Sequence, residues 1–152
     1  MRKPILVTGG TGTLGSVVVQ RLLDTGQDVR VLSRRPGSTG TAREWATGDL
    51  RTGAGIDAAT SGVDVIVHCA TTLSSKDVAA TERLIGAARR NGEPHLVYIS
   101  IVGVDRVPLF YYRAKLEAEE RVRNSGLPWT ILRPRSSTTW WPARSRCSAG
   151  HL

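Results

Sequence analysis

The glycine-rich segment near the N-terminus constrains the fold of this chain more than any other feature. It reads TGGTGTLG from Thr8 to Gly15 and spaces three glycines as G-x-x-G-x-x-G. A short apolar run precedes it at residues 5–7, and apolar residues at helical spacing follow it over residues 14–23. The pattern predicts a buried strand, a tight glycine turn and a helix, in that order.

A turn of this kind is suited to binding a pyrophosphate. Glycines let the backbone approach the anion closely, and the helix N-terminus offers unpaired N–H groups and the positive end of the helix dipole. A strand before and a helix after the glycines, within a strand–helix–strand unit of about thirty residues, is the context that dinucleotide binding requires. We therefore predict that Gly9, Gly12 and Gly15 hold a dinucleotide cofactor. The alternative is a tight turn without a ligand, which has little need of three glycines.

The end of the second predicted strand indicates which dinucleotide binds. A site for NAD usually has an acidic residue there for the ribose 2′-hydroxyl, whereas this chain has Ser33, Arg34 and Arg35. Two cations suit a 2′-phosphate, so NADP(H) is expected in preference to NAD(H). The alternative is a solvated basic turn, because exposed arginines are common.

The rest of the chain continues the alternation of short apolar runs and longer amphipathic segments. Further strands are predicted at residues 28–34, 44–46, 63–70, 95–100 and 129–132, and helices at 76–91 and 111–124, with room for a short helix before residue 63. Strands separated by helices imply right-handed crossovers. We predict an α/β fold, a Rossmann-like doubly wound parallel sheet with helices on both faces.

Composition narrows the functional classes. Of the net charge of +8, Arg135, Arg144 and Arg146 lie in residues 134–152, which hold no acid, so the rest of the chain carries +5. The other arginines are interspersed with acids, which makes nucleic acid an unlikely main partner. No apolar run approaches the roughly 18 residues of a membrane span, and the N-terminus lacks a secretory core. We expect a cytoplasmic protein without membrane contact and, because Cys69 and Cys147 have no ligand spacing, without a metal site.

Several segments together resemble one known family. TGxxGxxG, LSRRP, GDL at residues 48–50, HCATT, YISIVGVD and YYRAKLEAEE are similar to the atypical short-chain dehydrogenases/reductases, in their NmrA-like, NAD(P)-binding branch. The resemblance covers residues 3–133. It implies that the residues bordering the pyrophosphate are Thr11, Gly12, Thr13 and Leu14, that Arg34 borders the adenosine phosphate, that Asp49 and Leu50 border the adenine, and that Ala70, Thr71 and Thr72 border the cofactor ribose.

The same resemblance implies a catalytic pair. The family motif Tyr-x-x-x-Lys is present as Tyr111 and Lys115, which lie on one face of a helix. In such enzymes the tyrosine exchanges a proton with the substrate carbonyl, while the lysine binds the nicotinamide ribose and lowers the pKa of the tyrosine. Ser100 lies near the position of the family's catalytic serine, which is usually a residue or two later. The alternative is that Tyr111 and Lys115 are ordinary helix residues, with Lys115 the safer cofactor contact.

The sequence loses its pattern after Arg133. Relatives of this branch commonly continue Leu-Arg-Ala-Thr-Gln-Phe-His-Asp-Leu-Val, and deletion of a single G from codons chosen for that text spells residues 132–141 of this chain. We therefore divide the chain into an NAD(P)-binding Rossmann domain at 1–133 and an aberrant tail at 134–152, out of frame and without regular structure. The C-terminal part of the family fold is then missing. The alternative is a genuine divergent tail.

Three functional hypotheses remain. The first is an oxidoreductase that transfers hydride between NADP(H) and an unidentified small carbonyl, quinone or similar substrate, inactive as truncated. The second is a non-catalytic NAD(P) redox sensor that binds a partner protein. The third is a nonfunctional fragment of marginal solubility, because an exposed sheet edge and apolar surface favour aggregation.

Overall fold

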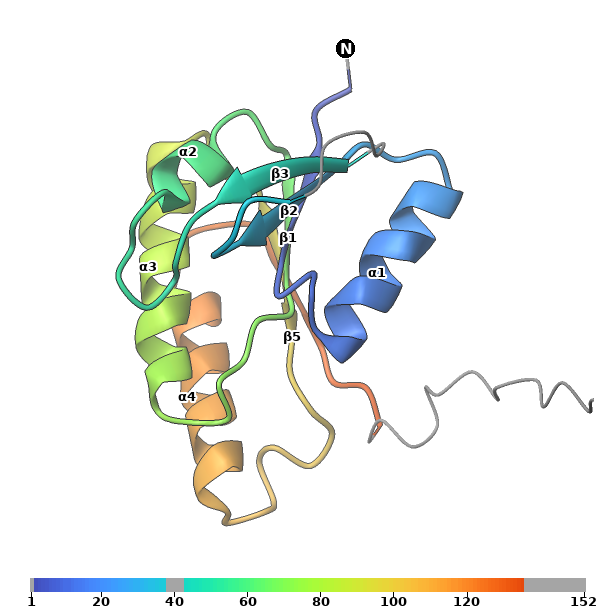
Figure 1. The fold of residues 1–152 in the computed structure, drawn as a ribbon. Coiled ribbons are helices and arrows are strands. Elements are labelled where there is room, and N and C mark those ends of the chain that lie inside the picture. The colour runs from blue at the N-terminus through green and yellow to red at the C-terminus, as the bar shows by residue number, and fades with distance from the viewer. Residues whose placement is uncertain (1, 38–42, 136–152) are drawn as a thin grey trace, which may run out of the picture.

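Six parallel strands form a single sheet in the order β3-β2-β1-β4-β5-β6 (Figure 1). The structure is a computed structural model that describes residues 2–37 and 43–135. The strands are β1 Ile5–Thr8, β2 Val29–Ser33, β3 Arg43–Thr47, β4 Val65–His68, β5 His95–Ile99 and β6 Trp129–Leu132. The helices are α1 Thr13–Asp24, α2 Ile56–Thr60, α3 Lys76–Arg90 and α4 Phe110–Arg123.

This arrangement confirms the predicted fold class. Every predicted strand and helix is present, and most boundaries differ by one or two residues. The main difference is the strand predicted at 63–70, which is confined to Val65–His68. The residues after His68 leave the sheet because they form the loop that crosses its carboxyl edge towards α3. Of the tail predicted at 134–152, residues 136–152 lie outside the described part of the chain.

The two faces of the sheet are covered differently. Side chains alternate along each strand, so Leu6 packs on one face and Val7 on the other. Helices α2, α3 and α4 lie against the first face, and α1 lies against the second (Figure 1). The larger core is therefore on the side of the three helices, where its fully buried members include Leu6, Ile56, Ile66, Leu84, Leu96, Tyr98 and Val122.

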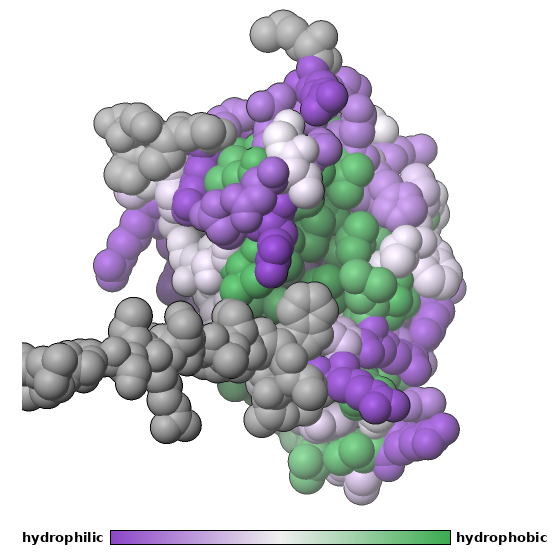
Figure 2. Space-filling model, turned by 90° about the vertical axis from the view of Figure 1, so that its right-hand side faces the viewer, coloured by the Kyte–Doolittle hydropathy of each residue, from purple (hydrophilic) through white to green (hydrophobic). Residues whose placement is uncertain are grey.

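On the α1 side, the sheet is less completely covered over β4, β5 and β6. Within residues 2–37 and 43–135, α1 is the only helix on this face, and it packs on β1 and β2. Val97 and Ile99 are only partly buried, and Leu132 is 48% exposed. Figure 2 shows apolar side chains gathered in a hollow on this side of the molecule. Apolar surface of this kind favours association, and the marginal solubility of the chain stays a prediction.

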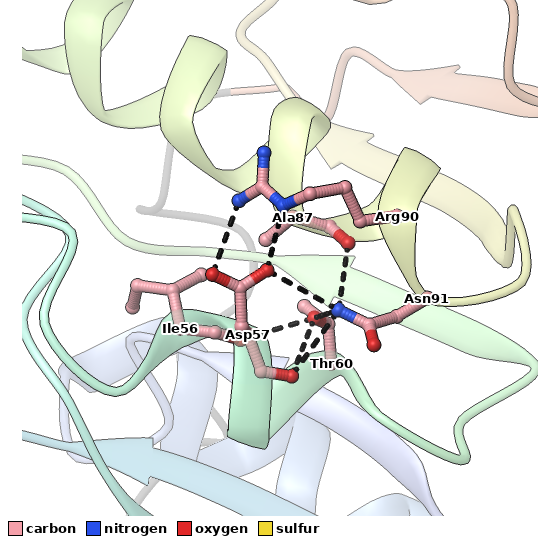
Figure 3. A network of polar contacts seen from close by, with 6 residues as sticks. All are labelled: Ile56, Asp57, Thr60, Ala87, Arg90 and Asn91. Atoms are coloured by element: carbon pink, nitrogen blue, oxygen red, sulfur yellow. Dashed lines mark hydrogen bonds and ion pairs between the residues drawn. The ribbon is translucent and has the colours of Figure 1, made fainter.

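A polar network joins α2 to the C-terminal end of α3 (Figure 3). The Asp57 carboxylate accepts hydrogen bonds from Arg90 Nε at 2.9 Å and Arg90 Nη2 at 3.1 Å. Asn91 Nδ2 donates to the Ala87 carbonyl at 3.0 Å and to Thr60 Oγ1 at 3.1 Å. Because Asp57 and Arg90 are both mostly exposed, their ion pair contributes little stability and mainly orients the short helix α2.

A buried carboxylate fastens β6 to α4. Glu119 is fully buried, and Arg133, directly after β6, donates to it from Nε at 2.9 Å and from Nη2 at 2.6 Å. Arg123 Nη2 donates to the same carboxylate at 2.9 Å. Burial acts to raise the pKa of Glu119, but the hydrogen bonds from Arg133 together with the other nearby hydrogen-bond donors and positive charges outweigh it and hold that pKa below its ordinary value. Glu119 therefore stays ionised and paired at neutral pH.

Replacing this carboxylate tests its contribution to the fold. Glu119→Ala should lower the free energy of unfolding by about 2 kcal/mol, because charge-assisted hydrogen bonds from two arginines are lost. Glu117→Ala is the matched control, since Glu117 pairs with Arg121 at an exposed i,i+4 position and should cost under about 0.5 kcal/mol. Urea denaturation measures both. Equal midpoints for the two variants would contradict the role of Glu119.

Candidate functional site

An open cavity of about 930 Å³ lies at the carboxyl edge of the sheet. In a parallel sheet the carboxyl ends of all strands meet at one edge, so loops distant in sequence converge there. The loops after β1, β2, β3, β4 and β5 all contribute to the wall, together with the first turns of α1, α3 and α4. The cavity is therefore the place where the residues predicted from the sequence can act together.

The glycine turn forms the part of the wall between β1 and α1. Gly9 has a φ of +68°, and its carbonyl accepts a hydrogen bond from the Gly12 N–H at 3.0 Å. A Cβ on Gly15 would lie 1.9 Å from that carbonyl oxygen, and one on Gly9 would lie 2.6 Å from Ala70 N. Only glycine allows this approach. Gly12 has no side chain to cap α1, so the first-turn N–H groups of the helix are available to an anion.

The wall beyond β2 and β3 is basic and exposed. Ser33 and Arg34 line the cavity, whereas Arg35 is not among the lining residues. Asp49 lines it too, and Arg51 donates to its carboxylate from the backbone N–H at 2.8 Å and from Nη2 at 2.8 Å. These hydrogen bonds from Arg51 lower the pKa of Asp49. Asp49 is thus an ionised carboxylate with a fixed orientation.

The loop after β4 is fastened by a buried acid at the start of α3. Asp77 Oδ2 accepts from Thr71 Oγ1 at 2.5 Å, and Asp77 Oδ1 accepts from the Thr72 N–H at 2.7 Å and from Thr72 Oγ1 at 2.6 Å. Asp77 is 4% exposed, while Thr71 and Thr72 are exposed to the cavity. The acid therefore lies beneath the loop and fixes the two threonines from below.

A buried histidine links this loop to β1. His68 Nδ1 lies 2.6 Å from Thr8 Oγ1, and His68 Nε2 lies 3.1 Å from Thr81 Oγ1. The Thr81 hydroxyl donates to the Asp77 carbonyl at 2.8 Å, so it can only accept from the ring. The proton is therefore assigned to Nε2, and Nδ1 accepts from Thr8. Burial lowers the pKa of His68 to about 3, which keeps the ring neutral.

The residues that the family resemblance assigns to catalysis lie at the end of the cavity beyond β5. Ser100, Tyr111 and Lys115 all line the cavity. Lys115 is 4% exposed, donates from Nζ to the Ile99 carbonyl at 3.2 Å and lies 4.9 Å from the centroid of the Tyr98 ring. Ser100 is buried, and its Oγ has no hydrogen-bond partner among the described residues. The same hydroxyl acts to lower the pKa of Glu119, so it lies near that carboxylate as well as the cavity.

The protonation of this pair is governed by burial. Desolvation raises the pKa of the half-buried Tyr111 and lowers the pKa of Lys115. The direction for Tyr111 is the reverse of the one that the resemblance implies, because burial, and not a neighbouring lysine charge, dominates its surroundings in the described chain. Tyr111 is consequently a neutral phenol at physiological pH, able to donate a proton.

The structure brings together nearly all of the residues singled out from the sequence. The lining residues among them are Gly9, Thr11, Gly12, Thr13, Leu14, Gly15, Ser33, Arg34, Asp49, Leu50, Ala70, Thr71, Thr72, Ser100, Tyr111 and Lys115, which leaves only Arg35 outside. Cys69 is half-buried and also lines the cavity. Sequence reasoning missed Arg51 and Asp77. Asp77 resembles an ordinary acid in the first turn of a helix, and no sequence signal shows that it is buried.

The sequence profile of a family described as NAD(P)H-binding matches residues 9–148. The chain belongs to this family. Its fold and the glycine turn at the carboxyl edge are those that the family requires for a dinucleotide. The match includes much of the segment for which we predict a shifted reading frame; the nucleotide sequence after codon 133 tests that prediction.

Two of the relatives that this chain matches in sequence are named for different functions. The "(4-alkanoyl-5-oxo-2,5-dihydrofuran-3-yl)methyl phosphate reductase" of Streptomyces griseus is 40% identical over 96% of this chain and 53% of its own length. The photosystem II assembly factor Ycf39 of Cyanophora paradoxa is 32% identical over 85% of this chain and 44% of its own length. The chain thus spans about half the length of these relatives.

Solved structures support the same fold. An NADPH-dependent quinone oxidoreductase of Escherichia coli, in complex with NADPH, superposes with a TM-score of 0.77 at 24% identity, over 85% of this chain and 48% of that protein. At this identity the likeness concerns the fold alone. Among the described residues, no helix is long and apolar enough to cross a membrane.

The contact between Gly15 and Gly9 leads to a first prediction for the site. Gly15→Ala should destabilise the chain by about 2–3 kcal/mol, because the new methyl group overlaps the Gly9 carbonyl, and it should weaken binding of NADPH. Gly86→Ala is the control: its Cβ would meet only Arg90 Nη1, at the far end of a long side chain, at 3.4 Å, and alanine should stabilise α3 by about 0.5–1 kcal/mol. Thermal and urea unfolding measure both. Unchanged stability of Gly15→Ala would refute the tight turn.

His68 leads to a second prediction, on pH dependence. His68 has its ordinary pKa of 6.5 in the unfolded chain and a pKa of about 3 in the folded chain. Below pH 6.5 the unfolded chain therefore binds a proton that the folded chain does not. The stability that the neutral ring provides is present above pH 6.5 and lost as the pH falls, by up to about 1.4 kcal/mol per pH unit. Between pH 7 and pH 5, the wild-type chain should lose about 2 kcal/mol more than His68→Gln. Parallel pH profiles of the two proteins would contradict a buried neutral ring.

Proposed function

We propose that this chain binds NADP(H) across the carboxyl edge of its sheet, as the cofactor domain of an oxidoreductase that transfers hydride to a small carbonyl, quinone or similar substrate. The observation that supports it best is the convergence, in one cavity, of the glycine turn, Arg34, and the pair Tyr111 and Lys115. These residues come from loops and helices far apart in the sequence, and the function requires them together.

The order of the strands supports one orientation of the bound cofactor along the cavity. Arg34 follows β2, the glycine turn follows β1, Thr71 and Thr72 follow β4, and Ser100 follows β5. An extended dinucleotide that lies along this edge has its pyrophosphate at the glycine turn. We assign the adenosine half to the exposed basic end, near Arg34, Asp49 and Leu50, and the nicotinamide half to the end near Thr72 and Lys115.

The chemistry follows from this direction. When bound, the cofactor would supply a hydride to the substrate carbon or quinone ring, and the Tyr111 phenol would supply the proton to the substrate oxygen. Burial favours this role in reduction, because it keeps the phenol protonated. Lys115 binds the ribose hydroxyls, and the Ser100 hydroxyl donates to the substrate oxygen. Water then reprotonates Tyr111.

Substrate choice is assigned to the segment that follows β6 in the family that the chain resembles. We infer that this segment forms the wall that holds a substrate, and that the described part of the chain supplies the cofactor side of the site. The name of the Streptomyces relative, a reductase of a phosphate-bearing lactone, favours a small polar substrate with a reducible bond.

A second candidate function is a non-catalytic NAD(P) sensor that reports redox state to a partner protein. The relative named as a photosystem II assembly factor favours it. Turnover separates the two, measured as NADPH oxidation with a panel of quinones and carbonyls in protein whose reading frame has been restored after codon 133. Oxidation that is lost in Tyr111→Phe supports the reductase, whereas binding without oxidation supports the sensor.

The cofactor preference gives the test of the binding proposal. NADPH should bind more tightly than NADH, and Arg34→Ala should weaken NADPH about tenfold, a change of about 1.4 kcal/mol, while leaving NADH within about twofold. Arg35→Ala is the matched control, because this arginine does not line the cavity. Titration followed by intrinsic fluorescence or calorimetry measures the affinities of all three proteins for both cofactors. Tighter binding of NADH by the wild-type chain would overturn the role of Arg34.

A further inference from the structure

Asp77 lines the cavity from the first turn of α3, and none of the roles proposed above involves it. Every hydrogen bond that the described residues give its carboxylate comes from Thr71 or Thr72. Its two oxygens accept two hydroxyls and one backbone N–H, so this acid in the first turn of α3 is turned towards the loop. A buried carboxylate is costly unless it is fully hydrogen-bonded, and here the loop alone provides the bonds.

The loop that Asp77 holds is in a strained conformation. Leu73 follows the two threonines directly and has a φ of +58°, in the left-handed region that disfavours residues with a side chain. Its N–H donates to Thr71 Oγ1 at 3.2 Å, and the same hydroxyl donates to Asp77 Oδ2. The carboxylate therefore orients the Thr71 oxygen that satisfies the strained residue. Without the hydrogen bonds to Asp77, we expect the loop to leave this conformation.

The backbone of Asp77 connects the loop to the sheet. Its carbonyl accepts from Thr81 Oγ1, which accepts from His68, which in turn accepts from Thr8 at the end of β1. Hydrogen bonds thus link Thr8 to the backbone of Asp77, and the Asp77 side chain extends this link to the two threonines of the β4–α3 loop. Such a fully satisfied buried network rigidifies the residues that it joins.

We propose that Asp77 is a positioning residue for the nicotinamide half of the cofactor site, acting through Thr71 and Thr72. This inference rests on the proposed function, since it assigns that half of NADP(H) to the β4 and β5 end of the cavity. Asp77 fixes the loop before the cofactor arrives, so the loop is not ordered at the expense of binding.

The electrostatics agree with this placement. Burial lowers the pKa of Lys115, and the Asp77 carboxylate opposes that change, since its negative charge favours the lysine cation. Asp77 therefore also supports the charged form of the residue assigned to the ribose. The adenosine half lies across the glycine turn, beyond the reach of these contacts.

Because the two halves of the cofactor are assigned to different ends of the cavity, the affinity of each half can be measured separately. A merely structural role of Asp77 would not weaken one half selectively. Asp77→Ala should weaken NADPH about tenfold and leave 2′,5′-ADP, the adenosine half alone, within about twofold. Asp57→Ala is the matched control, as it removes another first-turn acid that is exposed and outside the cavity, and it should change neither affinity. Calorimetric titration of the 152-residue chain with each ligand measures the split.

A double-mutant cycle tests the route. If Asp77 acts through the loop, Asp77→Ala in a Thr71→Val, Thr72→Val background should add less than about twofold to the loss of NADPH affinity. Full additivity, or equal weakening of NADPH and 2′,5′-ADP by Asp77→Ala, would overturn the proposal. Should the wild-type chain bind neither ligand, the proposed function fails, and the inference with it. Binding of both ligands by the wild-type chain with an unaffected Asp77→Ala variant refutes the inference alone.

Discussion

The close approach of Gly15 to the Gly9 carbonyl is the constraint on which the rest of the structure depends. A Cβ at residue 15 would lie 1.9 Å from that oxygen, so α1 can begin this near to β1 only because residue 15 lacks a side chain. The approach places the N-terminus of α1 at the carboxyl edge of the sheet. It thereby creates the anion-binding position around which the remaining loops are arranged.

The polar groups at the two ends of the cavity differ in their exposure to solvent, and therefore in how they can act on a ligand. Near β2 and β3, the exposed positive charges of Arg34 and Arg51 can steer and select an anion, but solvent screens both of them. Near β4 and β5, the polar groups are buried, and their value lies in being fixed before a ligand arrives. Under the proposed function, cofactor choice is assigned to the first end, and the geometry needed for hydride transfer is assigned to the second.

The fold could be predicted closely from the sequence because each strand and helix carries a local signal. Apolar runs, helical spacing and glycine stops determined the elements, and the parallel sheet follows from their alternation. Most of the cavity was predictable too, since the strand ends converge on one edge. Asp77 and Arg51 could not be found in this way, because their importance lies in hydrogen bonds to neighbouring loop residues. The direction of the Tyr111 pKa also depends on burial, which no motif shows.

Amide chemical shifts of the 152-residue chain, recorded by NMR during titration with NADPH, test the central claim most directly. The account predicts that the perturbed amides lie at the carboxyl edge of the sheet, among them Gly12, Thr13, Arg34, Leu50, Thr72 and Ser100. The amides of Gln27, Gly62, Gly92 and Gly126, which precede β2, β4, β5 and β6 at the opposite edge, should stay unchanged. Perturbations concentrated at that opposite edge, or no perturbation at saturating NADPH, would contradict it.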